Sequence, residues 1–312
     1  MKIIILGGAG FLGVSLAQLL KSNGKEVVVV DSKSRLKKNK QYLNNIVSLP
    51  MDFPEIDLSF LNQLFDQGDQ LVHMACTTNP NKSMKNIKFD ASSNIIPSIE
   101  IFSLAVKNKL DKIVFTSSGG TVYGNCQSKI IKENEDKNPI SAYGVSKLAI
   151  ENYLNVITMG SETNGVSLRV GNPFGSYQLK GTTIGAIAAF MNFTQNNQQI
   201  NIYGDGSIVR DYIYIDDVSN AFLYSLNHKN LHGTFNIGSG IGFSINEILA
   251  LIKEILNIDQ KIAFHKSRQF DVPRIILDAS KFKQKTNWKP KITVKNGIEL
   301  IWKDLQNELV MN

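Results

Sequence analysis

The sequence predicts an α/β protein with a Rossmann-like, doubly wound parallel sheet and a smaller C-terminal α/β cap. Three observations support this fold class. Short runs rich in Val and Ile alternate with longer helical stretches, a glycine-rich turn follows the first of these runs, and the pattern changes after Asn172. Alternating strands and helices favour a parallel sheet with right-handed crossovers and helices on both faces.

The apolar runs are interpreted as strands that are buried on both faces, because they are apolar almost throughout. In the first half they span residues 2–6, 26–31, 70–75, 112–118 and 166–171. The helical stretches between them cover residues 11–23, 57–66, 90–108 and 142–160. Beyond residue 172, we expect helices at 183–196, 216–227, 244–256 and 294–309, with strands near 233–237 and 274–279.

The chain length indicates two structural units. At 312 residues and 43% hydrophobic content, the chain can bury a sizeable core, which excludes wholesale disorder. We expect residues 1–172 to form the sheet domain and residues 173–312 to form mainly the cap. A later segment, about 208–240, is expected to rejoin the sheet domain.

Charge and cysteine content limit the partners and the compartment. Lys and Arg number 34 against 27 Asp and Glu, so the net charge of +7 attracts anions. The basic run 32–40 has no interleaved aromatic residues, so we interpret it as a solvated loop and expect no nucleic acid. Two cysteines cannot build a disulfide framework, and no apolar run reaches about 18 residues, so we expect a cytoplasmic protein that does not enter membranes. The histidines lack metal-ligand spacing, so no metal is expected.

The glycine-rich turn after the first strand predicts a dinucleotide site. Gly7, Gly10 and Gly13 stand in the pattern G-x-x-G-x-x-G, directly before a predicted helix. Gly7 allows a tight turn, Gly10 lets backbone N–H groups approach a pyrophosphate, and Gly13 lets the helix pack closely on the strand. The turn joins a strand to a helix, which is the context that this motif requires.

Asp31 ends the second predicted strand, eighteen residues after Gly13. A carboxylate at this place can hydrogen-bond the ribose hydroxyls of NAD, and it repels a 2′-phosphate. Lys33 or Arg35 in the basic run could still accommodate that phosphate. NAD is therefore the expected cofactor, and NADP stays open as the alternative.

Tyr143 and Lys147 carry the expected chemistry. Their i, i+4 spacing places them on one face of a predicted helix, about one turn apart. A nearby ammonium lowers the pKa of a phenol from about 10 toward neutrality. Tyr143 could then exchange a proton with a sugar hydroxyl while a hydride moves to or from a nicotinamide. Lys147 could also hydrogen-bond the nicotinamide ribose.

Further motifs stand in order along nearly the whole chain. They are Asp52, HMA at 73–75, SSGGTVYG at 117–124, YGVSK at 143–147, RVGNPFG at 169–175, YGDGSIVRDYIYIDDV at 203–218 and RQFDVPR at 268–274. Together with the glycine turn and Asp31, they resemble the extended short-chain dehydrogenase/reductases, in the NAD-dependent nucleotide-sugar epimerase/dehydratase branch around UDP-glucose 4-epimerase. The resemblance implies an enzyme whose cap binds a nucleotide sugar.

The resemblance also implies roles for individual residues. Tyr143 would be the acid/base and Lys147 its partner. On the cofactor side it implicates Phe11 and Leu12 in the glycine turn, Asp52 and Phe53 at the adenine, Ala75 in the cleft, and Thr116 beside the nicotinamide half. On the substrate side it implicates Asn172, Arg210 and Arg268 at the diphosphate, and Asp271 at the nucleoside. Arginine suits a diphosphate because its planar fork binds bidentately.

One position departs from the family pattern. Members of the family usually carry Ser or Thr as the third residue of a triplet, and that hydroxyl helps the tyrosine to polarise the C4 oxygen of the sugar. The triplet here is Ser117, Ser118 and Gly119, so glycine occupies the third place. Ser118 and Thr121 are the candidates that could supply the hydroxyl from a shifted position.

These observations predict a nucleotide-diphosphate-sugar 4-epimerase, in which Tyr143 acts as acid/base during reversible hydride transfer at C4. The alternative is an NAD(P)H-dependent 4-keto reductase of a dTDP- or other NDP-4-dehydro-6-deoxyhexose. A non-catalytic cofactor sensor is disfavoured by the intact Tyr143 and Lys147. Ile275, which the resemblance places near the C2 substituent, does not decide between hexose and N-acetylhexosamine, and UDP and dTDP both stay open. The resemblance further implies a homodimer packed through helices 90–108 and 142–160.

Overall fold

The computed structural model describes residues 1–178, 185–267 and 272–311, and it confirms the predicted fold class. Within these residues, one sheet of seven strands has the order β10-β6-β5-β4-β1-β2-β3, and every neighbouring pair is parallel. The strands are β1 (Lys2–Leu6), β2 (Glu26–Asp31), β3 (Val47–Pro50), β4 (Gln70–His73), β5 (Lys112–Ser118), β6 (Asn164–Val170) and β10 (Gly233–Ile237). The strand order reverses between β1 and β4, which places a crevice at the carboxyl ends of these two strands.

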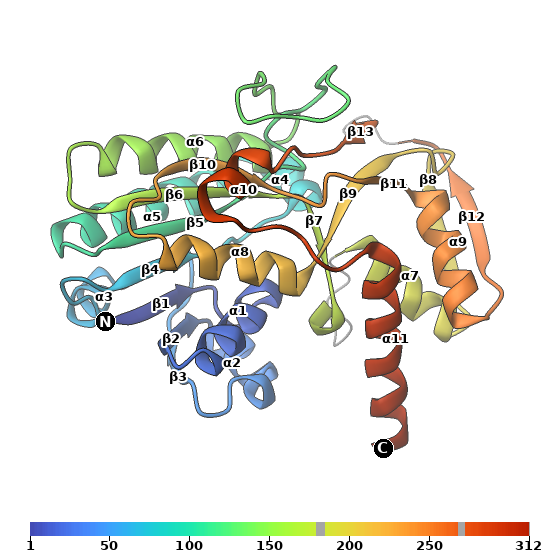
Figure 1. Ribbon diagram of the computed structural model, residues 1–312, viewed down its shortest axis with the longest axis horizontal. Coiled ribbons are helices and arrows are strands. Elements are labelled where there is room, and N and C mark those ends of the chain that lie inside the picture. Colours follow the sequence, from blue (N-terminus) through green and yellow to red (C-terminus); the bar gives the residue numbers. More distant parts are fainter. Residues whose placement is uncertain (179–184, 268–271, 312) are drawn as a thin grey trace.

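Helices cover both faces of this sheet (Figure 1). Leu16 and Phe222 on one face come from α1 (Phe11–Ser22) and α8 (Ile215–Asn227), and they share a core with the strand residues Ile3 and Val29. The other face is covered by α3 (Leu58–Leu64), α5 (Ile87–Lys107) and α6 (Ala142–Thr158). The remaining elements of this unit are α2 (Lys33–Lys38), η1 (Lys40–Tyr42), α4 (Pro80–Lys85) and α10 (Ser280–Thr286).

The second unit lies beside the carboxyl ends of the sheet and is built around β9 (Val209–Tyr214). This strand pairs in parallel with β7 (Asn172–Phe174) and β13 (Arg274–Ile275), and antiparallel with β11 (Gly242–Ser244). The other elements are η2 (Ser176–Gln178), α7 (Ala186–Gln195), the parallel pair β8 (Gln199–Tyr203) and β12 (Lys261–His265), α9 (Ile245–Leu256) and α11 (Val294–Met311). Most of their buried apolar side chains share one core, against which Phe11 and Leu12 of α1 also pack.

Two later segments lie with the first unit although they follow the start of the cap in the sequence. Helix α8 packs against α1, and β10 adds to the sheet edge beside β6. In Figure 1 the orange segments α8 and β10 therefore lie among the blue and green elements. Because β9 leads directly into α8, the chain runs from the middle of the cap back to the sheet.

The structure corrects the interpretation of the basic run as a loop. Residues Lys33–Lys38 form the short helix α2, whose N-cap Ser32 accepts a hydrogen bond from the Arg35 N–H at 3.4 Å. None of its residues is buried, so the run is solvated as expected. The helix was not predicted because so short and polar a segment has no apolar periodicity. No helix in the described ranges is long and apolar enough to span a bilayer.

Candidate functional site

The glycine turn lies at the crevice between β1 and β4. Gly7 has a φ of +80°, and a Cβ there would lie 2.6 Å from the backbone nitrogen of Ala75 at the end of β4. A Cβ on Gly13 would lie 2.5 Å from the Cα of Gly8. Side chains are therefore excluded at both positions, and the backbone of the turn stays open to a ligand at the strand ends.

The turn also leaves the N-terminus of α1 available. Gly10 is the N-cap of this helix and offers no side chain to cap its first N–H groups. Such uncapped N–H groups, at the positive end of the helix dipole, bind phosphate oxygens. The partly buried side chains of Phe11 and Leu12 pack against the core of the cap, and Leu12 also packs against the core of the sheet.

Asp31 ties the end of β2 to the glycine turn. Its carboxylate accepts hydrogen bonds from the backbone N–H of Ala9 at 3.0 Å and of Ser32 at 2.7 Å. Burial raises the pKa of Asp31, while Arg35 and these hydrogen bonds act in the opposite direction. The Arg35 guanidinium lies 3.9 Å from the carboxylate and close to Gly10. An acidic and a basic side chain thus both stand where the adenosine ribose of a dinucleotide would lie.

The other expected cofactor residues lie at neighbouring strand ends. Asp52 is exposed just after β3, and Phe53 packs on the core with its ring 5.6 Å from that of His73. Ala75 is buried against Gly7. Thr116 on β5 is 8% exposed, and its hydroxyl has no hydrogen-bond partner.

Tyr143 and Lys147 lie together on the first turns of α6, as their spacing predicts. Lys147 is 4% exposed, and its ammonium donates a hydrogen bond to the Thr116 carbonyl oxygen at 2.9 Å. The same nitrogen lies 5.5 Å from the centre of the Tyr143 ring and 4.8 Å from that of Phe115. Helix α6 thus places the Tyr143 phenol and the Lys147 ammonium next to the end of β5.

The expected direction of the Tyr143 pKa shift is wrong for this arrangement. Burial raises the pKa of the Tyr143 phenol above its usual value, and the nearby Cys76 and Asp90 add to the effect. The physical reason is that desolvation, the largest contribution, disfavours the charged phenolate. Burial thus favours the protonated form of Tyr143 in this structure.

The sequence analysis did not predict a buried polar stripe next to Tyr143, which consists of Asp90, Asn94 and Ser146. Asp90 on α5 accepts a hydrogen bond from Ser146 on α6 at 2.6 Å, and also one from Thr78. Asn94, one turn further along α5, accepts the backbone N–H of Thr77 at 3.0 Å. Asp90, Asn94 and Ser146 line a small pocket together with Cys76, Tyr143 and Lys147. Asp90, Asn94 and Ser98 stand at i, i+4 and i+8, and this spacing of polar residues on one face of α5 was the available signal.

The position of Gly119 explains the departure from the family pattern. A Cβ on Gly119 would lie 2.4 Å from Cδ1 of the buried Leu277, so a side chain here would meet the core. The next residue, Gly120, faces the site: its Cβ would lie 3.2 Å from Asn172 Oδ1 and 3.9 Å from Ser118 Oγ. The structure thus brings Ser118 and Asn172 to one place, whereas the Thr121 hydroxyl is buried without a partner.

The remaining substrate-side residues come from the cap. Arg210 on β9 donates hydrogen bonds to the carbonyl oxygens of Val209 at 2.9 Å and Val272 at 2.6 Å. These contacts hold the guanidinium at the junction of β9 and the segment before β13. Arg268 and Asp271 lie outside the residues that the structure describes.

Comparisons with known proteins agree with this geometry. Residues 3–238 match the NAD dependent epimerase/dehydratase family. A UDP-glucose 4-epimerase from Thermotoga maritima, solved with UDP-glucose, is 30% identical; the match covers 99% of this chain and 100% of that one, with a TM-score of 0.88. The NAD complex of the Thermus thermophilus UDP-glucose 4-epimerase is 26% identical, covering 98% and 99% of the two chains, with a TM-score of 0.88. A dTDP-4-dehydro-6-deoxyglucose reductase from Escherichia coli is 30% identical and covers 97% of both chains. The chain therefore belongs to the NAD dependent epimerase/dehydratase family, as an NAD-dependent enzyme of the sugar-nucleotide epimerase or reductase type.

Proposed function

We propose that this enzyme is a nucleotide-diphosphate-sugar 4-epimerase in which Tyr143 is the acid/base. The observation that carries the proposal is the placement of Lys147, which is held against the Thr116 carbonyl with its ammonium 5.5 Å from the Tyr143 ring. This pair stands at the end of β5, where the Ser118 hydroxyl and the Asn172 amide also meet. A sugar hydroxyl between them would have a proton acceptor and a hydrogen-bond donor on one side of the ring.

The residues at the strand ends fit NAD. The side-chain-free turn at Gly7 and Gly10 and the uncapped start of α1 would hold the pyrophosphate, and Asp31 the adenosine ribose. On the nicotinamide side, Lys147 and Thr116 would line the cleft. When bound, NAD would supply the acceptor for the C4 hydride, which the reduced form would give back after the 4-keto sugar has turned its other face to it.

Tyr143 would take the proton of the C4 hydroxyl as the carbon is oxidised and return it when the carbon is reduced. This requires the phenolate, which burial disfavours. Lys147 opposes that penalty, and any further positive charge brought into the cleft lowers the pKa of Tyr143 in the same direction. Ser118, whose hydroxyl lies 3.9 Å from the Cβ position of Gly120, would donate a hydrogen bond to the C4 oxygen, because the Thr121 hydroxyl is buried. Asn172, Arg210, Arg268 and Asp271 are proposed to bind the nucleotide diphosphate.

A 4-keto reductase of a deoxyhexose nucleotide is the second candidate. One observation favours it: Arg35 lies 3.9 Å from Asp31 and beside Gly10, where a guanidinium could bind the 2′-phosphate of NADPH. A reductase would consume NADH or NADPH as a cosubstrate. An epimerase would regenerate its NAD in each cycle.

One experiment separates the two reactions. The purified protein is incubated with UDP- and dTDP-hexoses, N-acetylhexosamines and 4-keto-6-deoxyhexoses, with and without NADH or NADPH. Conversion of one C4 isomer into the other without added cofactor identifies the epimerase. Stoichiometric loss of reduced-nicotinamide absorbance with a 4-keto sugar identifies the reductase. A protein that converts no sugar of the panel under either condition contradicts both proposals.

We further propose a homodimer formed through α5 and α6, which pack side by side. These helices expose large apolar side chains, among them Ile87, Ile96, Tyr153 and Val156. An exposed apolar surface of this kind suits a symmetric interface. Sedimentation equilibrium should give about twice the chain mass, and V156E should shift the protein toward the monomer.

A further inference from the structure

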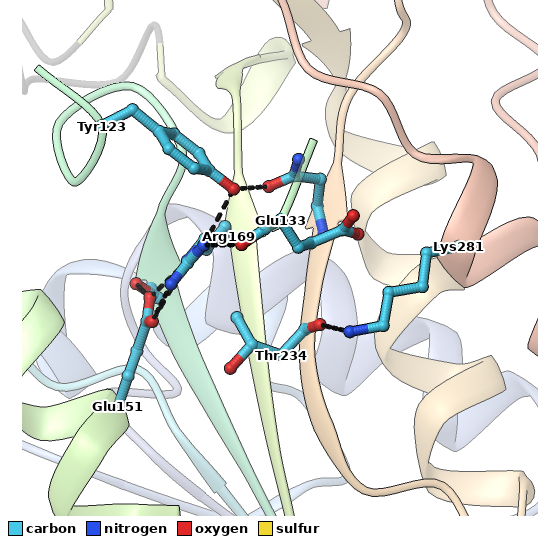
Figure 2. Close-up of polar contacts among 8 residues, drawn as sticks. Tyr123, Glu133, Glu151, Arg169, Thr234 and Lys281 are labelled. Carbon is cyan, nitrogen blue, oxygen red and sulfur yellow. Dashed lines mark hydrogen bonds and ion pairs between the residues drawn. The ribbon is translucent and has the colours of Figure 1, made fainter. Parts of the chain in front are cut away.

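A buried ion pair lies beside the candidate site and takes no part in the chemistry described above. Arg169 on β6 and Glu151 on α6 are each 4% exposed. Arg169 Nη2 lies 2.6 Å from Glu151 Oε2, and Arg169 Nε lies 3.0 and 3.1 Å from the two carboxylate oxygens. The guanidinium therefore binds the carboxylate in the bidentate geometry that orients both groups (Figure 2).

Stability alone is a weak explanation for such a pair. Taking two charges out of water costs free energy that their mutual attraction often fails to recover, and apolar residues of similar volume are frequently as stable. What the pair does provide is a fixed geometry between the segments that it joins. The segments that meet at the guanidinium therefore indicate its role.

On one side, the pair holds the face of α6 that carries the acid/base. Glu151 lies one turn after Lys147, which in turn lies one turn after Tyr143, so the three side chains share a face. Glu151 also accepts a hydrogen bond from the hydroxyl of Ser117. Ser117 directly follows Thr116, whose carbonyl binds Lys147. The carboxylate thus joins α6 to the end of β5 beside the site.

On the other side, Arg169 holds the turn that follows β5. Its Nη1 donates to the Tyr123 hydroxyl at 2.9 Å, and Tyr123 donates to Asn236 Oδ1 at 2.6 Å. Burial raises the pKa of Tyr123 to about 12, so this hydroxyl keeps the proton that it donates. Nη1 also lies 3.4 Å from the Glu133 carbonyl oxygen, and Figure 2 shows Arg169 between Glu151 and Tyr123. The turn from Ser117 to Tyr123 is therefore held at both ends.

We propose that Arg169 is a positioning residue for the reaction. Through Glu151 it holds the face of α6 with Tyr143, and through Tyr123 it holds the turn with Ser118. The inference rests on the proposed function, because it assigns Arg169 to the same reaction. Arg169 sets the distance between the two groups that meet the sugar, and a misplacement of about 1 Å can cost on the order of 100-fold in rate.

R169K is the test variant, because lysine keeps the charge and loses the planar fork. We expect kcat to fall roughly 10- to 100-fold, while KM for the sugar nucleotide and the dissociation constant of NAD stay within about twofold. Y123F removes a single hydroxyl and keeps the proposal testable if R169K does not fold. Its kcat should fall roughly two- to tenfold, as for the loss of one hydrogen bond.

K112M is the matched control. Lys112 is as buried as Arg169 and begins the neighbouring strand β5, at the end away from the site. Its ammonium donates to the Ser225 carbonyl oxygen at 2.9 Å. A purely structural role predicts the same pattern for both variants, namely a lower thermal midpoint with native kcat. The proposal expects that pattern for K112M only.

A second measurement needs no substrate, so it separates this proposal from the proposed function. Protein labelled with carbon-13 at tyrosine Cζ gives a resonance for Tyr143 that is assigned by its loss in Y143F. R169K should shift or broaden this resonance, whereas K112M should leave it in place. If the native enzyme converts no sugar nucleotide, the proposed function fails while the resonance still reports the position of the phenol. Folded R169K with native kcat, or with an unchanged Tyr143 resonance, overturns the proposal.

Discussion

Serine at position 119 would restore the hydroxyl that the family usually carries there, and the structure predicts that it destabilises the protein. A Cβ on Gly119 would lie 2.4 Å from Leu277 Cδ1 and 3.1 Å from the Arg169 carbonyl oxygen. Leu277 is fully buried in a cluster with Val122 and Ile131, so moving its side chain aside would disturb the packing of its neighbours. Overpacking of this kind costs about 1–3 kcal/mol, and we expect G119S to lower the free energy of unfolding by that amount.

Urea unfolding followed by circular dichroism measures this loss, and a double-mutant cycle with L277A isolates its cause. L277A alone should cost about 2–5 kcal/mol because it leaves a cavity. G119S should then cost less in the L277A background than in the native protein, with a coupling of about 1–3 kcal/mol. Additive losses would show that Leu277 does not occupy this space. G119S with native stability and a higher kcat would refute the reasoning, because its side chain would then reach the site.

Three further predictions follow from the site. Y143F should lose roughly 100- to 10,000-fold in kcat while NAD binding, measured by titration, stays native; near-native turnover would remove Tyr143 from its role. D31N presents an amide N–H₂ in place of one acceptor oxygen, so NAD affinity should fall roughly tenfold or more, and unchanged affinity would contradict the placement of the ribose. His73 is fully buried with its pKa lowered to about 3 from 6.5, by burial and by Lys147. The folded protein thus binds fewer protons than the unfolded chain between these values, so the free energy of unfolding should fall by on the order of 4 kcal/mol as the pH drops from 6.5 toward 3. H73Q should lack this part of the pH dependence in urea titrations, and an identical slope would assign it to other groups.

Long, uniform strands were predictable from the sequence because burial on both faces governs their composition. The strands Lys2–Leu6, Glu26–Asp31 and Lys112–Ser118 match their predicted ranges, since burial on both faces demands continuous Val and Ile. Strand β8 was missed although its sequence QINIY alternates polar and apolar residues, because five residues that follow the polar run 195–198 give only a short signal. Helix α4 was missed because it is fixed by its ends rather than by a face: Asn79 caps it and Pro80 begins it.

The site shows the same division between local and tertiary information. The spacing of Tyr143 and Lys147 is a local property, and it placed both groups on one helix face as predicted. The identity of the hydroxyl beside them is a tertiary property. It depends on Leu277, which lies more than 150 residues away in the sequence and fills the space at Gly119. Without its packing partners, the motif could therefore only indicate Ser118 and Thr121 as two candidates for the catalytic hydroxyl.

The error in the Tyr143 pKa has an identifiable source on another helix. The prediction from the sequence considered only the charge of Lys147 on the same helix, and it omitted the groups that the fold brings from elsewhere. Asp90 arrives from α5 and Cys76 from the end of β4, and both raise the pKa of the phenol that burial has already raised. The ammonium that opposes them is itself bound to the Thr116 carbonyl. Because Asp90 is linked to α6 through Ser146, the stripe that opposes ionisation of Tyr143 also holds the helix that carries it. Asp90 on α5 is therefore one tertiary contribution to the acidity of Tyr143, and a change in the packing of α5 against α6 should alter this pKa without touching either Tyr143 or Lys147.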